Sequence, residues 1–353
     1  MYLQSISSAF PGNVLSQRDC WELFQSSGRL DRLKTRSRDL LERILLGDSG
    51  IATRRFACGD PTSVFDLDAG GLHRAFAEAA PVLAANAVRN ACGRAGIVPR
   101  DLDALLVCTC TGYLCPGVSS YVAETLELRE DAFLQDLLGL GCGAAIPMFE
   151  AARGVVALRP GAIVATVAVE ICSAAFYLDD DPGVLISLCL FGDGAAAAIW
   201  RGEDAGGQLR MGNFRTVHLP EHREKIRFVN SGGKLKNQLH RSVPTLAAAA
   251  VSGLFRQRSF EPDRMISHTG GRDVIEEIER AIPGFPLAET RGVLRDFGNI
   301  SSPCVLVALE RALAGREADR LWLTAFGAGF AAHSCELRGN ANATLHRHTG
   351  RSA

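Results

Sequence analysis

Short apolar runs alternate along the chain with longer segments whose apolar residues recur at helical spacing. Apolar runs bounded by turn residues predict buried strands, and their alternation with helices predicts an α/β architecture. The strands expected are Asp103–Thr109, Ala162–Val169, Ala195–Trp200, Met265–His268 and Leu321–Ala325. The helices expected are Pro116–Leu128, Pro244–Arg256, Arg272–Ile282 and Ser301–Ala314.

Two distant segments of the chain resemble each other. Phe191–Ala198 reads FGDGAAAA and Phe326–His333 reads FGAGFAAH, so each is a Phe-Gly-x-Gly turn that leads into a strand. Each lies downstream of a small-residue turn that opens an apolar helix, at residues 141–143 and 299–302. This pattern predicts an internal duplication with one set of α and β layers in each half.

The segment Gly202–Gly207 is polar and glycine-rich, which favours a boundary between the halves near it. We therefore expect an N-terminal half over residues 1–205 that carries the nucleophile proposed below. A C-terminal half would cover residues 206–338. Residues 339–353 are polar and without periodicity, which is typical of a flexible tail.

Composition narrows the function classes. The chain has 353 residues, 47% of them hydrophobic, and a net charge of −1. This balance argues against a nucleic-acid or membrane-surface partner for the chain as a whole. The N-terminus lacks the pattern of a signal peptide, and no apolar stretch is long enough for a transmembrane helix. We therefore expect a cytoplasmic protein.

The eleven cysteines are scattered and odd in number, which argues against a disulfide framework. They form no CxxC pair, and His346 and His348 in the tail are too few for a metal site, so no metal is expected. Most of these cysteines are therefore interpreted as small buried hydrophobic residues.

Cys142 is the exception that carries candidate chemistry. It lies among small residues in Gly139-Leu-Gly-Cys-Gly-Ala-Ala145, immediately before an apolar helix. Pro147 is tolerated only in the first turn of that helix, so the helix must begin close to Cys142. The positive end of the helix dipole and its free N–H groups would favour a thiolate there. A buried cysteine in a tight turn is the structural alternative.

His268 and Asn299 lie in comparable places. His268 ends a strand and enters a glycine turn, whereas Asn299 lies on a loop ahead of a helix. Ser301 or Ser302 can cap that helix and Pro303 suits its first turn, so Asn299 is free to point into a cavity. Taken singly, each is as readily a structural histidine or a turn asparagine.

Together the three residues predict a reaction. Each sits at a strand end or at the turn into a helix, where open α/β sheets bind ligands. A thiolate can accept an acyl group, and a histidine can hold that thiolate as an ion pair. An imidazole N–H and an amide N–H can stabilise the enolate that forms when a malonyl thioester loses CO2. We therefore predict a condensing enzyme that extends acyl thioesters, with Cys142 as its nucleophile.

At this point the chain resembles the type III polyketide synthases of the chalcone synthase superfamily, which have the thiolase fold. The resemblance covers roughly residues 1–338. The matching motifs are Gly141-Cys142-Gly143, Phe191-Gly-Asp-Gly194, His268-Thr-Gly-Gly271, Gly298-Asn299-Ile-Ser-Ser302 and Phe326-Gly-Ala-Gly329. It implies a homodimer of αβαβα subunits, an acyl-CoA starter and malonyl-CoA as substrates, and no metal or organic cofactor.

The resemblance also assigns roles to individual residues. Cys142 matches the acylated nucleophile, and His268 and Asn299 match the pair that supports decarboxylation. Phe191 matches the gatekeeper between the CoA tunnel and the cavity, although a core aromatic is the alternative. The CoA-binding positions are Arg43, Gly271 and Ala328. Arg43 lies in the basic stretch Arg29–Arg55, which is equally well a solvated helix face.

Departures from the plant pattern indicate the substrate. By the family register, the cavity and second-gatekeeper positions hold Cys110, Thr111, Cys115, Cys172, Ala175 and Asn237. Small side chains at Cys172 and Ala175 should open space, and Asn237 replaces a gatekeeper phenylalanine. These segments resemble bacterial alkylresorcinol and alkylpyrone synthases, which implies a fatty acyl starter.

Other activities remain open on the sequence. A β-ketoacyl-ACP synthase III-like enzyme shares the Cys, His and Asn set but performs one condensation on a carrier protein. That group usually has a His-Gln-Ala-Asn run, whereas Thr-Gly-Gly follows His268 here. A cysteine hydrolase would need a base that activates water, and a purely structural subunit would not need all three residues.

Overall fold

The protein is described by a computed structural model that covers residues 1–203, 209–315 and 319–339. The strands are β1 (Tyr2–Ala9), β2 (Asn13–Ser16), β3 (Thr53–Phe56), β4 (Ala104–Cys108), β5 (Phe133–Leu137), β6 (Ile163–Glu170), β7 (Gly194–Arg201), β8 (Arg210–His218), β9 (Ile226–Ser231), β10 (Lys234–Leu239), β11 (Arg264–Ser267), β12 (Arg320–Gly327) and β13 (Ala331–Arg338). The helices are α1 (Gln17–Ser26), α2 (Thr35–Leu46), α3 (Ala69–Arg94), α4 (Val118–Thr125), α5 (Ala145–Leu158), α6 (Pro182–Leu190), α7 (Val243–Phe255), α8 (Arg272–Ala281), α9 (Ala288–Phe297) and α10 (Cys304–Gly315).

The strands of the main sheet follow the order β11-β12-β13-β8-β1-β7-β6-β4-β5. In the N-terminal part β4 is parallel to β6, β6 is antiparallel to β7, and β7 is antiparallel to β1. In the C-terminal part β11, β12, β13 and β8 repeat this sequence of directions. The repeat supports the predicted duplication. Within the sheet the two parts meet where β1 pairs with β8, at Tyr2 and Arg210.

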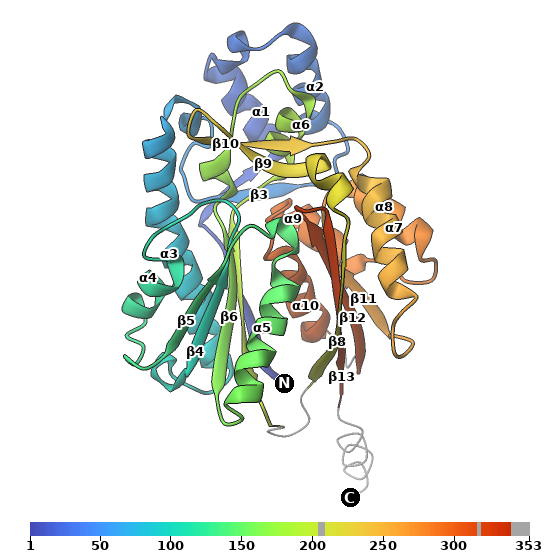
Figure 1. Cartoon of the computed structure of the whole chain (residues 1–353). Coiled ribbons are helices and arrows are strands. Elements are labelled where there is room, and N and C mark those ends of the chain that lie inside the picture. Colours follow the sequence, from blue (N-terminus) through green and yellow to red (C-terminus); the bar gives the residue numbers. More distant parts are fainter. Residues whose placement is uncertain (204–208, 316–318, 340–353) are drawn as a thin grey trace, which may run out of the picture.

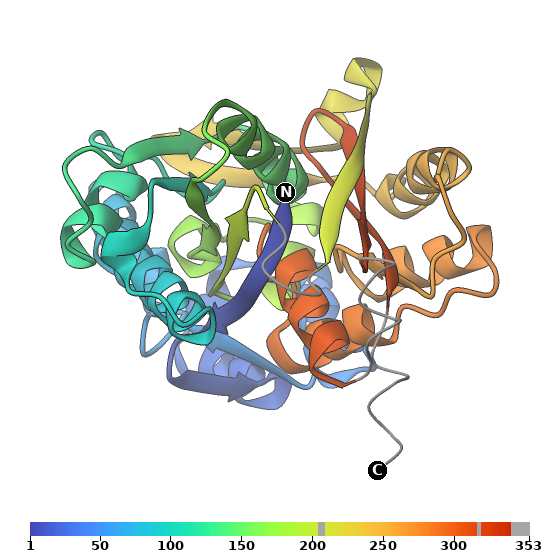
Figure 2. The same cartoon turned by 90° about the horizontal axis from the view of Figure 1, so that it is seen from below.

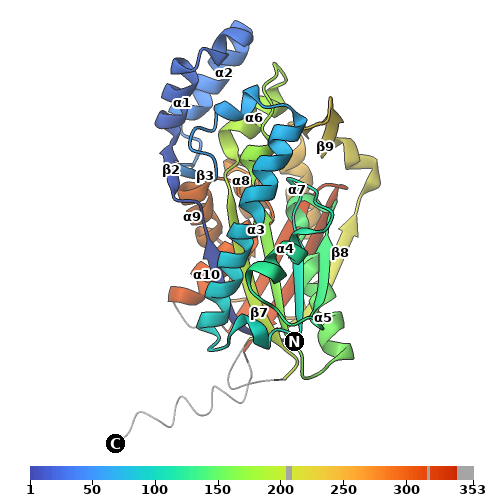
Figure 3. The same ribbon diagram turned by 90° about the vertical axis from the view of Figure 1, so that its left-hand side faces the viewer.

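Five layers result from this sheet and its helices (Figure 1). Helices α5 and α10 contact strands of both halves and lie between them, as Figure 2 shows from below. The long helix α3 runs along the outer face of the N-terminal strands with α4 beside it, and α7 and α8 cover the C-terminal strands (Figure 3). This is the αβαβα arrangement of the thiolase fold, as predicted.

Both faces of the strands are covered, which explains why they appear in the sequence as continuous apolar runs. Along β4, Leu106 and Cys108 pack in the central cluster, whereas Leu105 and Val107 pack against the outer helix α3. The nine expected elements all exist, with bounds shifted by a few residues. The largest shifts are three residues, at the end of α4, which ends at Thr125 rather than Leu128, and at the start of α10, which begins at Cys304 rather than Ser301.

A smaller group of elements forms a cap over one end of the sheet (Figure 1). It consists of α1, α2, α6, the two-stranded sheet β2–β3 and the hairpin β9–β10, and an apolar cluster that includes Trp21, Leu41 and Leu185 holds much of it together. The cap matters because the cavity described below is enclosed between it and the strand ends. The limits of the two halves at residues 205 and 338 stay a prediction, and most of the expected tail, residues 340–353, lies outside the described residues.

Candidate active site

Cys142 lies in a one-turn helix, Gly141–Gly143, directly ahead of α5. A Cβ at Gly327 would lie 2.7 Å from the backbone nitrogen of Gly143 and 2.8 Å from that of Cys142. Glycine at 327 therefore lets the turn after β12 approach the Cys142 loop closely. Pro147 falls in the first turn of α5, as predicted, so the thiol lies near a helix N-terminus. That position favours a thiolate.

The Cys142 sulfur is surrounded by groups that favour its ionised form. Ser301 Oγ donates to Cys142 Sγ at 3.2 Å and also lies 3.2 Å from Cys110 Sγ. Hydrogen bonding from the Cys110 thiol, and then the His268 imidazolium and Ser301, hold the pKa of Cys142 well below its ordinary value of 9.0, although burial acts in the opposite direction. The contact with Cys142, together with burial, raises the pKa of Cys110, so Cys110 stays a neutral donor.

His268 follows β11 and is almost fully buried. Its backbone N–H donates to the carbonyl of Thr324 at 2.9 Å, and its ring meets Phe326 edge-on with centroids 5.1 Å apart. Burial lowers the pKa of His268, but the neighbouring sulfurs of Cys142 and Cys304 raise it to about 10. An imidazolium beside a thiolate is therefore the resting state of the pair.

Asn299 is held by its backbone and by its side chain. Its backbone pairs with Phe191 as an isolated parallel bridge, and its N–H donates to the carbonyl of Leu190 at 2.8 Å. Its Nδ2 donates to the Gly270 carbonyl at 2.7 Å, and its Oδ1 accepts from the N–H of Ser301 at 2.8 Å. One hydrogen of Nδ2 is left to donate to a ligand.

Ser301 and Ser302 differ from the expectation that one of them caps α10. Ser301 Oγ contacts Cys142, and Ser302 Oγ donates to Glu170 Oε1 at 2.5 Å. Glu170 is fully buried at the end of β6 and also accepts from both N–H and Oγ1 of Thr111. Sequence reasoning assigned Glu170 no role, although one carboxylate that ends an apolar strand was a usable signal.

A cavity of about 740 Å³ lies between the cap and the strand ends, within the size range of ligand sites. Twelve of the thirteen residues predicted for the site line it: Cys142, His268, Asn299, Phe191, Cys110, Thr111, Cys172, Ala175, Asn237, Arg43, Gly271 and Ala328. The thirteenth, Cys115, does not line it and is exposed. Between Thr111 and Cys115 the chain packs closely against Phe76 at Gly112, where a Cβ would lie 2.3 Å from the Phe76 ring.

A second cavity of about 470 Å³ adjoins the first. Phe176 and Tyr177 line both, so these two side chains form the wall between them. The second cavity is polar and charged, with Arg32, Asp180 and Lys234 among its lining residues. The first is largely apolar on the side of α6 and the β9–β10 hairpin, where it meets residues such as Val184, Leu188, Ile226, Phe228 and Leu239.

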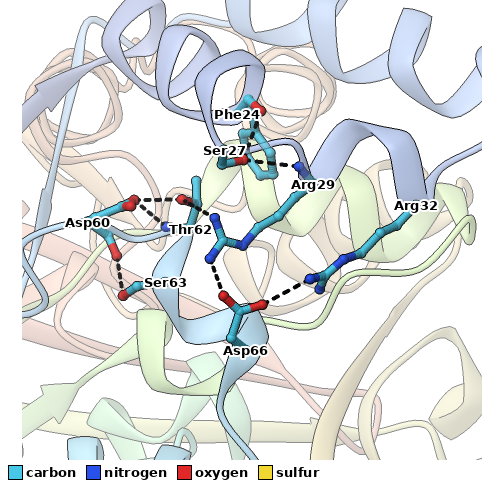
Figure 4. Close-up of polar contacts among 8 residues, drawn as sticks. All are labelled: Phe24, Ser27, Arg29, Arg32, Asp60, Thr62, Ser63 and Asp66. Carbon is cyan, nitrogen blue, oxygen red and sulfur yellow. Dashed lines mark hydrogen bonds and ion pairs between the residues drawn. The ribbon is translucent and has the colours of Figure 1, made fainter.

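The basic stretch that was expected to bind CoA contains two kinds of arginine: some are held by contacts within the protein, and others are exposed and could bind a phosphate. Arg29 and Arg32 both pair with Asp66, and Arg29 also donates to Thr62 (Figure 4). Arg54 is buried and donates to backbone carbonyl groups. Arg43, by contrast, is exposed on α2 and lines the catalytic cavity.

Other features bear on the expected cofactors and partners. Within the described ranges, no group of three histidine, cysteine or acidic side chains could hold a metal ion. All eleven cysteines lie in described positions and are free thiols, eight of them buried. None of the described helices combines the length and the apolar character needed to cross a membrane.

Fold and site together define a thiolase-fold protein with a buried cysteine, histidine and asparagine at one cavity. Residues 11–219 match the family described as FAE1/type III polyketide synthase-like protein, and the chain belongs to that family. It is 28% identical to 3,5-dihydroxyphenylacetyl-CoA synthase of Streptomyces toyocaensis over 249 residues, which cover 65% of this chain and 64% of that protein. It is 28% identical to 1,3,6,8-tetrahydroxynaphthalene synthase of Streptomyces peucetius over 351 residues, which cover 95% and 92%.

Solved structures agree with this assignment at the level of the fold. PKS-I from the brown alga Ectocarpus siliculosus superposes with a TM-score of 0.87, covering 96% of this chain and 98% of that one at 23% identity. The likeness therefore extends over both halves, beyond the segment that matches the family.

Proposed function

We propose that the protein is a type III polyketide synthase, an acyltransferase that loads an acyl-CoA starter on Cys142 and extends it with malonyl-CoA. The observation that carries the proposal is the meeting of Cys142, His268 and Asn299 at one cavity, with a thiol whose pKa is lowered. The match spans less than two thirds of the length of 3,5-dihydroxyphenylacetyl-CoA synthase, the first relative named above. The activity of this protein is therefore proposed from its own site and is not transferred from that relative.

Loading would begin with attack of the Cys142 thiolate on the thioester carbonyl of the starter, which expels CoA thiolate and leaves an acyl-enzyme. His268 and Asn299 would then donate to the carbonyl oxygen of malonyl-CoA. The C–C bond to the carboxylate breaks, CO2 leaves, and its electron pair forms an enolate that these donors stabilise. The enolate carbon attacks the acyl-enzyme, Cys142 thiolate leaves, and the longer chain rests on CoA.

The proposed chemistry asks for no metal or organic cofactor, because loss of CO2 supplies the carbanion and hydrogen bonds stabilise it. Phe191 would act as the gatekeeper, since it lines the cavity and pairs through its backbone with Asn299. Asn237 lines the same cavity, but its Nδ2 donates to Ser187 Oγ at 2.7 Å, so it would be a fixed polar wall. Arg43, Gly271 and Ala328 are the residues proposed to bind CoA.

For the starter we propose a fatty acyl-CoA, and for the product an alkylresorcinol or alkylpyrone. The apolar lining on the side of α6 and β9–β10 and the small side chains of Cys172 and Ala175 support this choice. The names of the relatives, a dihydroxyphenylacetyl-CoA synthase and a tetrahydroxynaphthalene synthase, point to compact aromatic products for those proteins. A cytoplasmic location is part of the proposal, because both substrates are CoA thioesters.

A homodimer is also proposed. Strand β5 is the edge of the sheet, and Phe133 and Leu134 on it are 39% and 37% exposed. Tyr113, Tyr121 and Leu138 extend the exposed apolar surface, and an edge strand with such residues is prone to pair with another chain. Light scattering should give twice the chain mass, and the double variant Phe133→Lys/Leu134→Lys should give the mass of one chain.

The decisive experiment incubates the protein with malonyl-CoA and a ladder of C2–C18 acyl-CoAs and identifies the products by mass spectrometry. Polyketides with two or more added ketide units support the proposal, and C8–C18 starters used preferentially support the fatty acyl choice. Turnover of malonyl-CoA alone would contradict that choice and leave the family activity intact. One extension that requires an acyl carrier protein would instead indicate the β-ketoacyl-ACP synthase III-like reaction, and CoA release without extension a hydrolase.

A further inference from the structure

Cys304, the first residue of α10, lies behind the two donors of the candidate site. It is fully buried and does not line the cavity. Its Sγ lies 3.2 Å from Thr269 Oγ1 and donates to Asn299 Oδ1 at 3.6 Å. A buried thiol with two polar neighbours is more than a space-filling hydrophobic residue.

The His268 ring supplies a second observation. Its Nδ1 is buried and has no hydrogen-bond partner among the described residues. Cys142 and Cys304 are the sulfurs that raise the pKa of this imidazole, although Nδ1 forms no hydrogen bond with either in the structure. An imidazolium carries an N–H on both ring nitrogens. If one N–H points into the cavity, the other needs a hydrogen-bond acceptor inside the protein. Left unpaired, that buried N–H would be costly.

The amide of Asn299 depends on the same thiol. Oδ1 accepts hydrogen bonds from the Ser301 N–H at 2.8 Å and from the Cys304 thiol. Nδ2 donates one of its two hydrogens to the Gly270 carbonyl. These contacts fix which end of the amide faces the ligand, because only the nitrogen can donate. Cys304 therefore contacts Asn299 directly and also contacts Thr269, the residue that follows His268.

We propose that Cys304 is a positioning residue: its S–H donates to Asn299 Oδ1, and its sulfur is the acceptor that the buried Nδ1–H takes up when the His268 ring is charged and engaged with substrate. The two donors are thereby held in one fixed relation. Cys304 touches no substrate and takes no part in bond making. The inference rests on the proposed function, since it assigns the two donors to one enolate oxygen.

Three variants separate this role from packing. Cys304→Ala and Cys304→Val both remove the polar contacts but differ in volume, whereas Cys304→Ser keeps a donor and an acceptor. Cys335→Ala is the matched control, because Cys335 is equally buried in the same core cluster and lies on β13. The measurements are CO2 release from malonyl-CoA, starter loading on Cys142 by mass spectrometry, and the pH profile of Cys142 alkylation.

The expected result is a fall in kcat for malonyl-CoA decarboxylation of about 10-fold to 100-fold in both Cys304→Ala and Cys304→Val, because small misplacements of catalytic groups have effects of this size. KM and starter loading should stay within about 3-fold, and the midpoint of Cys142 alkylation should rise in pH as the imidazolium is held less firmly. Cys304→Ser should recover most of the lost rate, and Cys335→Ala should match the wild type.

Two results would overturn the inference. One is decarboxylation by Cys304→Ala at the rate of Cys335→Ala. The other is a loss in Cys304→Ala that Cys304→Val, by filling the volume, restores. If the wild-type protein releases no CO2 from malonyl-CoA, the proposed function fails. The alkylation profile needs no substrate, so an unshifted midpoint in Cys304→Ala and Cys304→Val would still count separately against Cys304.

Discussion

The loop ahead of α5 and the loop ahead of α10 occupy equivalent places in the two halves, but they carry different chemistry. The first presents the thiol of Cys142 beside glycines. The second presents the amide of Asn299 and the hydroxyl of Ser301. In the proposed reaction a nucleophile attacks the carbonyl of the starter, whereas hydrogen-bond donors stabilise the carbonyl oxygen of malonyl-CoA. The nucleophile and the donors must therefore approach the substrates from different sides. The duplicated fold provides two equivalent loops, and each loop carries a different one of these groups.

The edges of the two halves differ as well. The N-terminal half ends in strand β5, whereas the described C-terminal residues form no strand beyond β11, and α9 contacts β11 there. One edge is therefore open to a partner chain and the other is covered. The two loops ahead of α5 and α10 therefore keep equivalent positions in the two halves, whereas the outer edges of the halves differ.

The largest expected effect comes from removing the nucleophile. Cys142→Ala should lower chain extension by at least about 10³-fold, because the pKa values of the neighbouring Cys110 and Cys172 thiols are raised and neither can replace the nucleophile. Decarboxylation of malonyl-CoA should stay within about 10-fold of the wild type, because its donors belong to the other half. Product analysis and CO2 release measure the two steps. Extension at the wild-type rate would refute the role of Cys142.

Removing the donor in the second loop should give the opposite pattern. Asn299→Ala should lower malonyl-CoA decarboxylation by about 10²–10³-fold, the usual cost of losing one donor to a developing oxyanion. Loading of the starter on Cys142 should persist. Asn237→Ala is the control, because Asn237 lines the same cavity and donates to Ser187 instead. Equal losses in both asparagine variants would show that cavity shape matters and not the donor.

A pH experiment tests which half stabilises the thiolate. With the pKa of Cys142 lowered, the rate of its alkylation by iodoacetamide should stay nearly constant as the pH falls from about 9 to about 6. An ordinary thiol would slow by roughly 200-fold over that interval, because it is protonated below a pKa of about 8.5. Cys110→Ala and His268→Ala should each restore part of this pH dependence, and Cys172→Ala should not. A wild-type midpoint near pH 8.5 would contradict the lowered pKa.

The elements and the duplication could be predicted from the sequence because they rest on local signals, and twelve of the residues named for the site line one cavity. Apolar runs, glycine turns and Pro147 mark where strands end and helices begin. The contacts among Cys110, Ser301 and Glu170 could not be predicted, because they join residues that are 60 to 191 positions apart. Cys115 does not line the cavity for a related reason: a register fixes a position along the chain but not the direction in which the side chain points.

The smallest expected effect concerns the cavity wall, which belongs to neither catalytic loop. Phe176 separates the apolar cavity from the polar one, and it also packs edge-on against Phe56 with centroids 6.0 Å apart. Phe176→Ala would risk about 3–5 kcal/mol of stability, so Phe176→Leu is the better variant. It should raise turnover of C16–C18 relative to C8–C10 starters by about 3-fold to 10-fold, since single methylene groups in a pocket have effects of this order.

Phe228→Leu is the matched control, because Phe228 lines the catalytic cavity without reaching the second one. Competition between two acyl-CoAs, followed by mass spectrometry, measures the ratio directly. Decarboxylation of malonyl-CoA should be unchanged in both variants, because neither residue contacts the donors. If Phe228→Leu shifts the ratio as much as Phe176→Leu does, starter length depends on total volume, and the wall between the cavities has no special role.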